Sequence, residues 1–170
     1  EPLGLDPDLS GDGATDATVG IVPVDVFGMP CRIDVIEALA GDRGWWLVED
    51  SCEAFGSMLG DRPMGSFGAA STFAFYPNKQ ITTGEGGMLL TDDDAIAASA
   101  RSLRNQGRDE DGTWLRHVAL GFNYRLDELS AAVGVGQLRR LEELNAKRSQ
   151  VFSWYSEELT SIAWLALPSP

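Results

Sequence analysis

The order of apolar runs near the start of the chain restricts its possible folds more than any other feature. Residues 19–28, VGIVPVDVFG, form a β-branched run ending at glycine and predict a strand followed by a turn. Residues 32–44 carry apolar side chains at helical spacing. Residues 45–51, WWLVEDS, form a short apolar run that turns acidic at its end, as buried parallel strands do. Strand, helix and strand in this order predict a βαβ unit, and hence an α/β fold with a mostly parallel sheet.

The helix predicted over residues 32–44 has sequence signals at both ends. Asp34 and Glu37 have the spacing of a capping box, in which side chains satisfy the first backbone N–H groups. Gly44 is the kind of residue at which helices end. We therefore expect both ends of this helix to be fixed locally.

Later segments extend the same fold. Apolar runs at 71–75 and 86–92 predict two more strands, and a helix at about 93–106 is expected to stop at Gly107. A second helical pattern begins near Leu126 and continues for about thirty residues. A helix this long reaches beyond a compact domain, so we expect it to lead to a second domain or a partner subunit. Its apolar stripe consists of Leu126, Leu129, Val133, Leu138, Leu141 and Leu144.

Composition argues against several functional classes. The formal net charge of −13 disfavours nucleic acid and anionic membranes as partners, because phosphate binding needs clustered Lys and Arg. No apolar run reaches the roughly 18–20 residues that span a bilayer. Two cysteines and one histidine do not provide a disulfide framework or a metal-ligand cluster. We expect a cytoplasmic protein of a reducing compartment, without a metal site. Its first residue, Glu1, and its acidic, Gly- and Pro-rich residues 1–18 suggest a fragment of a longer protein.

Lys79 stands in an unusual place for one of only two lysines in the chain. It follows the predicted strand 71–75, so its amine should lie near the carboxyl edge of the sheet, where ligands bind in open α/β folds. Asp50 ends the run 45–51 and should reach the same edge. Lys147, in contrast, lies on the polar side of the long helix and is interpreted as solvated. On position alone, Lys79 can equally cap a loop or form an ion pair with no catalytic role.

A lysine and a carboxylate in one pocket are also the groups that pyridoxal phosphate requires. This cofactor needs an amine for covalent attachment and an acidic partner for its pyridinium nitrogen, whose charge a carboxylate stabilises. A lysine with a pKa of about 10.4 must lose its charge to act as a nucleophile or base, and burial favours that loss. A further signal is the GFNYR turn with Asn123 before the long helix, because polar groups at a helix start can hold a phosphate. Such turns also carry asparagine without any ligand.

Several segments together resemble the DegT/StrS-type sugar aminotransferases, a branch of the fold-type I pyridoxal-phosphate enzymes. The resemblance covers about residues 19–160 and is most specific in the lysine segment and in GFNYR. It implies part of a three-layer large domain over residues 1–160, with its N-terminal portion missing. Residues 161–170 would begin the linker to a missing C-terminal small domain. The segments are VPVDVFGMP, VEDSCEAFGS, GSFGAASTFAFYPNKQITTGEGGMLLTDD, RSLRNQG and LGFNYRLDELSAAVGVGQLRRL.

The resemblance assigns roles to four residues of this chain. Lys79 matches the catalytic lysine that carries the cofactor and moves the proton. Asp50 matches the partner of the pyridine nitrogen, and Glu53 falls near the cofactor's phenolic oxygen. Asn123 matches a residue that reaches the cofactor phosphate of the neighbouring subunit, which implies a homodimer with shared active sites.

One departure from the family pattern concerns the phosphate. Many members have a serine five residues before the lysine, where this chain has Ala74. That contact is therefore missing or supplied by Ser71, Thr72 or Thr83. The resemblance also implies that the family's N-terminal segment, which carries a phosphate loop and a ring-stacking aromatic residue, lies outside these residues.

The implied reaction is amino transfer from glutamate to a nucleotide-linked keto-sugar, in polysaccharide or secondary-metabolite sugar biosynthesis. The lysine segment looks closest to perosamine-type enzymes, which favours amination at C-4. Dehydratase relatives have histidine in place of Lys79, so that option is disfavoured. A non-catalytic regulatory or binding module with the same fold is the main alternative, although such a module would not need Lys79 together with Asp50. An NAD-binding domain needs a G-x-G-x-x-G, which VDVFGMPCRID lacks.

Overall fold

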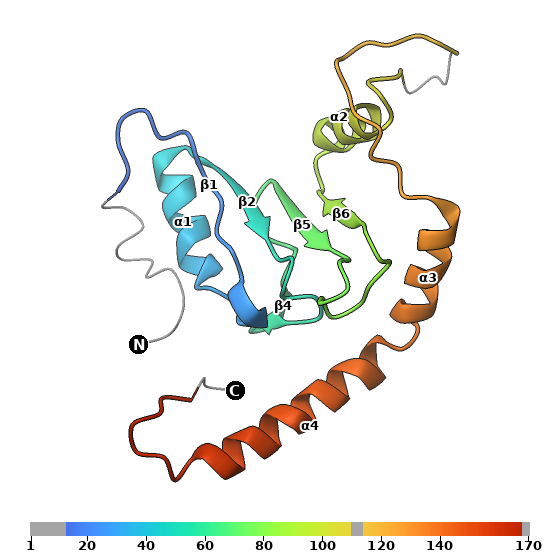
Figure 1. Cartoon of the computed structure of the whole chain (residues 1–170). Coiled ribbons are helices and arrows are strands. Elements are labelled where there is room, and N and C mark those ends of the chain that lie inside the picture. Colours follow the sequence, from blue (N-terminus) through green and yellow to red (C-terminus); the bar gives the residue numbers. More distant parts are fainter. Residues whose placement is uncertain (1–12, 110–113, 168–170) are drawn as a thin grey trace.

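The computed structural model describes residues 13–109 and 114–167, which form an α/β structure around one small sheet (Figure 1). The spatial order of its strands is β1-β2-β5-β6. β1 pairs with β2 and β2 with β5 in parallel, whereas β6 is antiparallel to β5. The predicted α/β class with a mostly parallel sheet is therefore confirmed. The four strands are β1 (Gly20–Ile21), β2 (Trp46–Asp50), β5 (Ala70–Ala74) and β6 (Gly87–Leu90).

The predicted βαβ unit consists of β1, α1 (Ile33–Arg43) and β2. Gly44 ends the helix with a φ of 65°, a left-handed conformation that favours glycine, so the predicted stop is confirmed. α1 packs its apolar side against Leu47 of β2. The side chains that it buries follow helical spacing and are Ile33, Ile36 and Ala40.

The capping box predicted at the start of α1 is wrong. Asp34 turns back to Arg32 in a 3.1 Å ion pair. Glu37 instead pairs with Arg62 at 2.9 Å and accepts the N–H of Gly68 at 3.0 Å. Charged and backbone donors elsewhere thus engage both carboxylates, and Glu37 ties the helix to the loop before β5.

The first strand is also shorter than the predicted run 19–28. β1 covers only Gly20–Ile21, and the chain then forms the 3₁₀ turn η1 (Val26–Gly28). Pro23 has no N–H to offer a ladder. Its carbonyl still accepts the N–H of Asp50, and the buried carboxylate of Asp25 accepts the N–H of Cys31 from beyond the turn, which holds the turn beside the end of β2.

A small hairpin between β2 and β5 has no counterpart in the sequence analysis. It consists of β3 (Met58–Leu59) and β4 (Arg62–Pro63), which pair in antiparallel fashion. Gly60 opens the two-residue turn with a φ of 62°. Strands of two residues leave too little alternation for a sequence pattern to detect.

The first predicted C-terminal helix is present as α2 (Asp94–Arg104). The carboxylate of Asp93 accepts the N–H groups of Ala95 and Ile96 at 2.7 and 3.0 Å. This N-cap satisfies two backbone groups that a helix start leaves unpaired. The predicted helix at about 93–106 is therefore confirmed within two residues at its C-terminal end.

The single long helix predicted from Leu126 is wrong, because the segment forms two helices, α3 (Glu128–Leu138) and α4 (Leu141–Leu159). At the junction the N–H of Arg140 bonds the carbonyl of Gln137 at 3.0 Å, the tighter three-residue spacing. The guanidinium of Arg140 binds Glu143 in the first turn of α4 at 3.1 Å. α4 extends away from the sheet (Figure 1).

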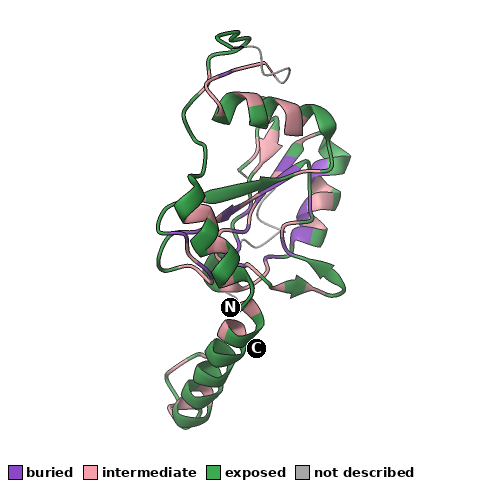
Figure 2. Ribbon diagram, turned by 90° about the vertical axis from the view of Figure 1, so that its right-hand side faces the viewer, coloured by how far each residue is buried: buried purple, intermediate pink, exposed green. Residues whose placement is uncertain are grey.

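Two apolar clusters form the core. One lies between α1 and β2, and the other gathers Phe73, Phe75 and Ile81 with partly buried side chains that include Leu141 and Leu144 of α4. Figure 2 shows burial concentrated in the sheet and α1. α2, α3 and α4 bury no residue fully in the structure described. The part of the apolar stripe on α3 is exposed, with Leu129 82% exposed.

Within the described ranges, no helix combines the length and the apolar composition needed to cross a bilayer. The same ranges contain no group of three His, Cys, Asp or Glu side chains placed to hold a metal ion.

Candidate active site at the carboxyl edge of the sheet

The amine of Lys79 lies just beyond the carboxyl end of β5. A turn in which the N–H of Lys79 bonds the carbonyl of Tyr76 at 3.0 Å follows the strand. Only 16% of the lysine side chain is exposed, and Nζ donates to Oε1 of Glu53 at 3.1 Å. Lys147 is exposed on α4 and pairs with Glu143, in the solvated position predicted for it. The two lysines therefore occupy chemically different environments.

Glu53 connects the lysine to the turn after β1. Its second oxygen, Oε2, accepts the N–H of Phe27 at 2.7 Å. This backbone donor first, and then the Lys79 amine, hold the pKa of Glu53 below its usual range. Phe27 has a φ of 60°, which is uncommon for a residue with a side chain. The turn thus presents its amide to a carboxylate that also binds the lysine.

Asp50 is the last residue of β2 and lies in register with Thr72 of β5. Its Oδ1 accepts the N–H of Cys52 at 3.1 Å. Burial raises the pKa of the Cys52 thiol to about 11; Asp50 contributes to the rise, and the charge of Lys79 opposes it. The structure thus pairs Lys79 directly with Glu53, and it places Asp50 at the end of the strand next to β5.

A buried carboxylate pair behind Asp50 was not predicted. Asp25 and Glu49 are fully buried, and the Ser51 hydroxyl, with one proton to donate, lies 3.0 Å from Oδ2 of Asp25 and 2.5 Å from Oε1 of Glu49. Glu49 also accepts the N–H groups of Gly65 and Phe67 at 2.6 and 3.1 Å. Burial raises the pKa of Glu49 above its usual range. The acidic residue at the end of the apolar WWLVEDS run was the available signal, because a buried glutamate needs such donors.

The structure narrows the candidates for a phosphate contact near Ala74. The hydroxyl of Ser71 is buried and donates to the carbonyl of Gly65 at 2.6 Å. Thr83 donates to the carbonyl of Glu85 at 2.6 Å. Thr72 is only half-buried and its Oγ1 lies 3.7 Å from the Cys52 sulfur. Of the three hydroxyls predicted, that of Thr72 is the one not already engaged by a backbone carbonyl.

Asn123 is exposed and lies in a different part of the fold. Its backbone bridges to Asn105 after α2, and no described contact joins it to Lys79, Asp50 or Glu53. The structure therefore does not bring Asn123 into the lysine cluster of its own chain.

Backbone hydrogen bonds join the segments RSLRNQG and GFNYR. The N–H of Gln106 bonds the carbonyl of Phe122 at 2.7 Å, and the N–H of Phe122 bonds the carbonyl of Leu103 at 2.7 Å. Gly107 has a φ of 72°, and a side chain there would collide with the carbonyl of Ala119. The two segments thus form one rigid unit, which spacing along the sequence could not reveal.

Comparisons with known proteins place these features in a family. The chain is 40% identical over 148 residues to the GDP-perosamine synthase of Caulobacter vibrioides, covering 87% of this chain and 40% of that protein. The crystal structure of DesI with its TDP-sugar product has a TM-score of 0.88 at 32% identity, over 98% of this chain and 42% of DesI.

A third similar protein is a dehydratase. The E. coli GDP-4-keto-6-deoxy-D-mannose-3-dehydratase, solved with bound hydrated PLP, has a TM-score of 0.89 at 27% identity, over 98% of this chain and 47% of that chain. The chain therefore spans less than half the length of the relatives that it matches.

The family match itself runs over residues 3–169, nearly the whole chain. It includes the lysine turn, the end of β2 and the GFNYR segment. The chain belongs to the DegT/DnrJ/EryC1/StrS aminotransferase family.

Proposed function

We propose that the whole protein transfers an amino group, with pyridoxal phosphate as cofactor, from glutamate to a nucleotide-linked 4-keto-sugar. The observation that carries this proposal is the largely buried Lys79 amine, which pairs with Glu53 at 3.1 Å, while Asp50 ends the strand next to β5. Residues 1–160 would belong to the large domain of this enzyme, and residues 161–170 would begin the linker to a smaller domain.

The residues present fit the lysine-bearing half of a pyridoxal-phosphate site. Lys79 offers one amine, restrained by a single side-chain hydrogen bond to Glu53. Asp50 offers an anionic oxygen at the end of the neighbouring strand, and Thr72 offers a hydroxyl beside it. The three groups are a nucleophile, an anionic partner for the ring nitrogen and a hydroxyl that can donate a hydrogen bond to the phosphate. These are the groups that the cofactor needs.

When bound, pyridoxal phosphate supplies an electron-withdrawing ring that makes the Cα proton of an amino acid acidic. Lys79 would hold the cofactor and then move that proton at its Nζ atom. Glu53 orients Nζ through the 3.1 Å contact while its other oxygen is fixed by Phe27. Asp50 would keep the ring nitrogen charged, because an opposite charge in hydrogen-bonding range stabilises the protonated form.

The acceptor is inferred from the similar proteins. One is named for GDP-perosamine, another was solved with a TDP-sugar product, and a third acts by name on a GDP-linked 4-keto-6-deoxy sugar. The shared chemistry is a sugar joined to a nucleoside diphosphate. The lysine in position 79 favours amino transfer over dehydration, because its amine can hold the cofactor covalently.

The reaction is tested with the intact protein loaded with pyridoxal phosphate. We expect 2-oxoglutarate to form from glutamate when a GDP-linked 4-keto-6-deoxy-hexose is supplied, with an amino-sugar detected by mass spectrometry. A UDP-linked 3-keto-sugar is the matched control for the carbon aminated. Turnover of the 3-keto-sugar alone would contradict C-4 amination, and no turnover with any keto-sugar would contradict the function.

We also propose a homodimer in which Asn123 of one subunit serves the cofactor of the other. Asn123 is exposed on a rigid unit and contacts none of the described lysine-site residues of its own chain. The neighbouring helix α3 exposes apolar side chains such as Leu129 and Val133, which a partner subunit would cover. Both features are explained if this region packs against a second copy.

Subunit exchange tests the shared site. A Lys79→Ala chain and an Asn123→Asp chain, each inactive alone, are mixed under conditions that exchange subunits. With shared sites, one site of the heterodimer collects both lesions and the other collects neither, so activity rises toward half of wild type per heterodimer. A mixture of Lys79→Ala with Asp50→Asn is the control, because both lesions then fall in the same chain's part of a site. Recovery in the control, or none in the test mixture, would contradict sharing.

A further inference from the structure

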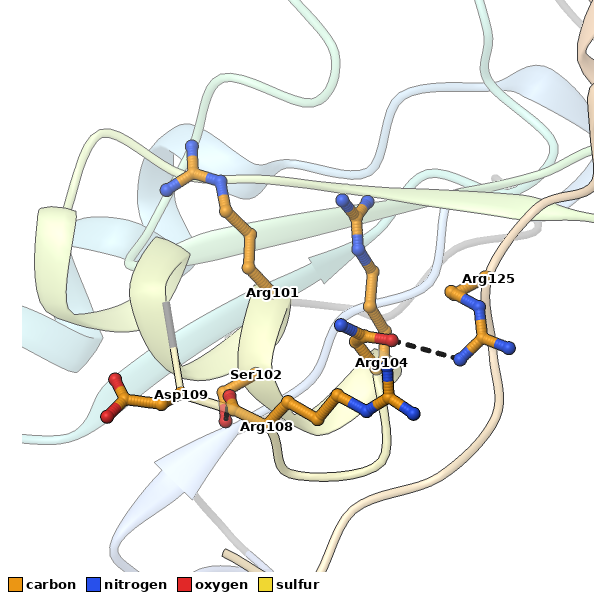
Figure 3. Close-up of a pocket in the computed structure, with 7 residues that line it drawn as sticks. Arg101, Ser102, Arg104, Arg108, Asp109 and Arg125 are labelled. Atoms are coloured by element: carbon orange, nitrogen blue, oxygen red, sulfur yellow. Dashed lines mark hydrogen bonds between the residues drawn. The ribbon is translucent and has the colours of Figure 1, made fainter. Parts of the chain in front are cut away.

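A hollow at the C-terminal end of α2 gathers positive charge from two segments. Its volume is about 430 Å³, and it lies where RSLRNQG meets the GFNYR turn (Figure 3). Arg101, Arg104 and Arg108 come from α2 and the turn after it, and Arg125 comes from the segment before α3. The remaining lining residues are Ser102, Asn105 and Asp109. We call this hollow the arginine pocket.

The charge in the arginine pocket is opposite to that of the chain as a whole. The chain has 26 acidic residues and a net charge of −13, yet four of its eleven arginines line this one hollow. The only carboxylate in the lining is that of Asp109, which pairs with Arg116 at 3.1 Å. None of the ion pairs among residues 13–109 and 114–167 involves the four arginines of the pocket. Four like charges this close repel one another, so the pocket favours a bound anion.

The arginines are held on a rigid frame. Nη1 of Arg125 donates to Oδ1 of Asn105 at 2.9 Å, which joins the two segments through side chains as well as backbone. The carbonyl of Arg108 accepts a hydrogen bond from the hydroxyl of Ser102 at 2.7 Å. The guanidinium of Arg108 lies 5.3 Å from the ring centre of Trp114. Nε of Arg108 is buried and bonds no described group.

Guanidinium groups bind phosphate through two parallel N–H bonds, and several of them match the charge of a diphosphate. The N–H of Gln106 and the carbonyl of Phe122 fasten this pocket to the turn that contains Asn123. If that turn serves a neighbouring subunit's cofactor, the arginines lie beside the substrate of that same site.

We propose that the arginine pocket binds the diphosphate of the nucleotide-sugar acceptor, an inference that rests on the function proposed above. Binding is measured by calorimetry on the intact protein, with inorganic pyrophosphate, GDP, UDP and TDP as probes. We expect Arg104→Gln and Arg108→Gln each to weaken binding at least tenfold. Arg139→Gln, which changes an exposed arginine outside the pocket, should leave binding within twofold of wild type.

Circular dichroism of each variant checks that the helices remain folded. Unchanged pyrophosphate and nucleotide binding in folded Arg104→Gln and Arg108→Gln proteins would overturn the inference. An equal loss of affinity in Arg139→Gln would also overturn the inference, because the loss would then come from the lower positive charge of the protein and not from this pocket.

Separate assays of the glutamate step and the nucleotide-sugar step distinguish diphosphate binding from binding of the amino donor. In the arginine variants, conversion of the cofactor by glutamate alone should proceed, while the KM for the nucleotide-sugar rises at least tenfold. Loss of the glutamate step instead would show that the pocket holds the donor's carboxylates, and would overturn the inference. If nucleotide binding depends on the arginines but wild type aminates no keto-sugar, the proposed reaction fails and the diphosphate site stands.

Discussion

Substitution of Glu49 by glutamine tests the buried network behind Asp50. Glu49 is fully buried, and its two oxygens accept three hydrogen bonds, from the Ser51 hydroxyl and from the N–H groups of Gly65 and Phe67. Glutamine has nearly the same shape but only one acceptor oxygen. If that oxygen keeps the hydrogen bonds from the Ser51 hydroxyl and the Gly65 N–H, the new amide NH₂ group faces the N–H of Phe67. These two donors then have no acceptor.

The expected destabilisation follows from those two unpaired donors. A buried donor left without a partner costs about 1–3 kcal/mol, so the free energy of unfolding should fall by roughly 2–6 kcal/mol. Relief of the buried negative charge offsets part of this loss, which puts the expected value near the lower end, at about 2 kcal/mol. Glu37→Gln is the control, because Glu37 also accepts a backbone N–H but is partly exposed. For Glu37→Gln we expect the free energy of unfolding to fall by ~1 kcal/mol or less.

The stability difference between wild type and Glu49→Gln should change with pH in one direction. Burial raises the pKa of Glu49 in the folded state above its unfolded value, which lies near 4.3. Its contribution to stability is therefore fully present below about pH 4.3 and is lost as pH rises through the raised folded pKa. The glutamine side chain of the variant does not titrate, so the difference between wild type and Glu49→Gln should shrink as pH increases through that window.

Urea-induced unfolding of the intact protein at fixed protein concentration, at several pH values, measures both effects. A penalty no larger than that of Glu37→Gln would refute the assignment of Glu49 as an acceptor for three buried donors. A penalty that grows with pH would refute the raised pKa.

Three further predictions concern the site and its frame. Asp50→Asn should retain cofactor but lower kcat at least ~10²-fold, about 2.7 kcal/mol of transition-state stabilisation, as steady-state kinetics would show; near-normal turnover would mean that another group keeps the ring charged. Gly107→Ala should weaken diphosphate binding and increase hydrogen exchange in the turn after α2, because a Cβ there meets the carbonyl of Ala119; unchanged exchange would contradict the rigid frame. Cys52 and Cys31, whose burial raises their pKa values to about 11 and 12, should alkylate far more slowly than a free thiol at pH 8; fast labelling of the folded protein would contradict their burial.

The sequence predicted those elements whose signals are local and repeated. The βαβ unit, Gly44 as the end of α1 and the two later strands all follow from apolar runs and a glycine stop. The position of Asp50 at the end of the strand next to β5 also follows, because parallel strands present their carboxyl ends together.

The sequence did not reveal features that depend on partners far along the chain. Glu37 and Arg62 are 25 residues apart, so their ion pair could not be separated from a capping box. The break between α3 and α4 falls at Arg139 and Arg140, which are good helix formers, and the nearest glycine, Gly136, lies inside the last turn of α3. The buried role of Glu49 depends on donors 16 and 18 residues away. The arginine pocket likewise forms only when two separated segments meet.

The central claim is that Lys79 carries the cofactor, and chemical trapping tests it most directly. The intact protein is incubated with pyridoxal phosphate, reduced with borohydride, digested and analysed by mass spectrometry. Because Lys79 is the largely buried amine paired with Glu53, we expect the pyridoxyl group on the peptide that contains Lys79 and none on the exposed Lys147. A label on Lys147 alone, or a Lys79→Ala protein that is still labelled to the same extent, would contradict the account.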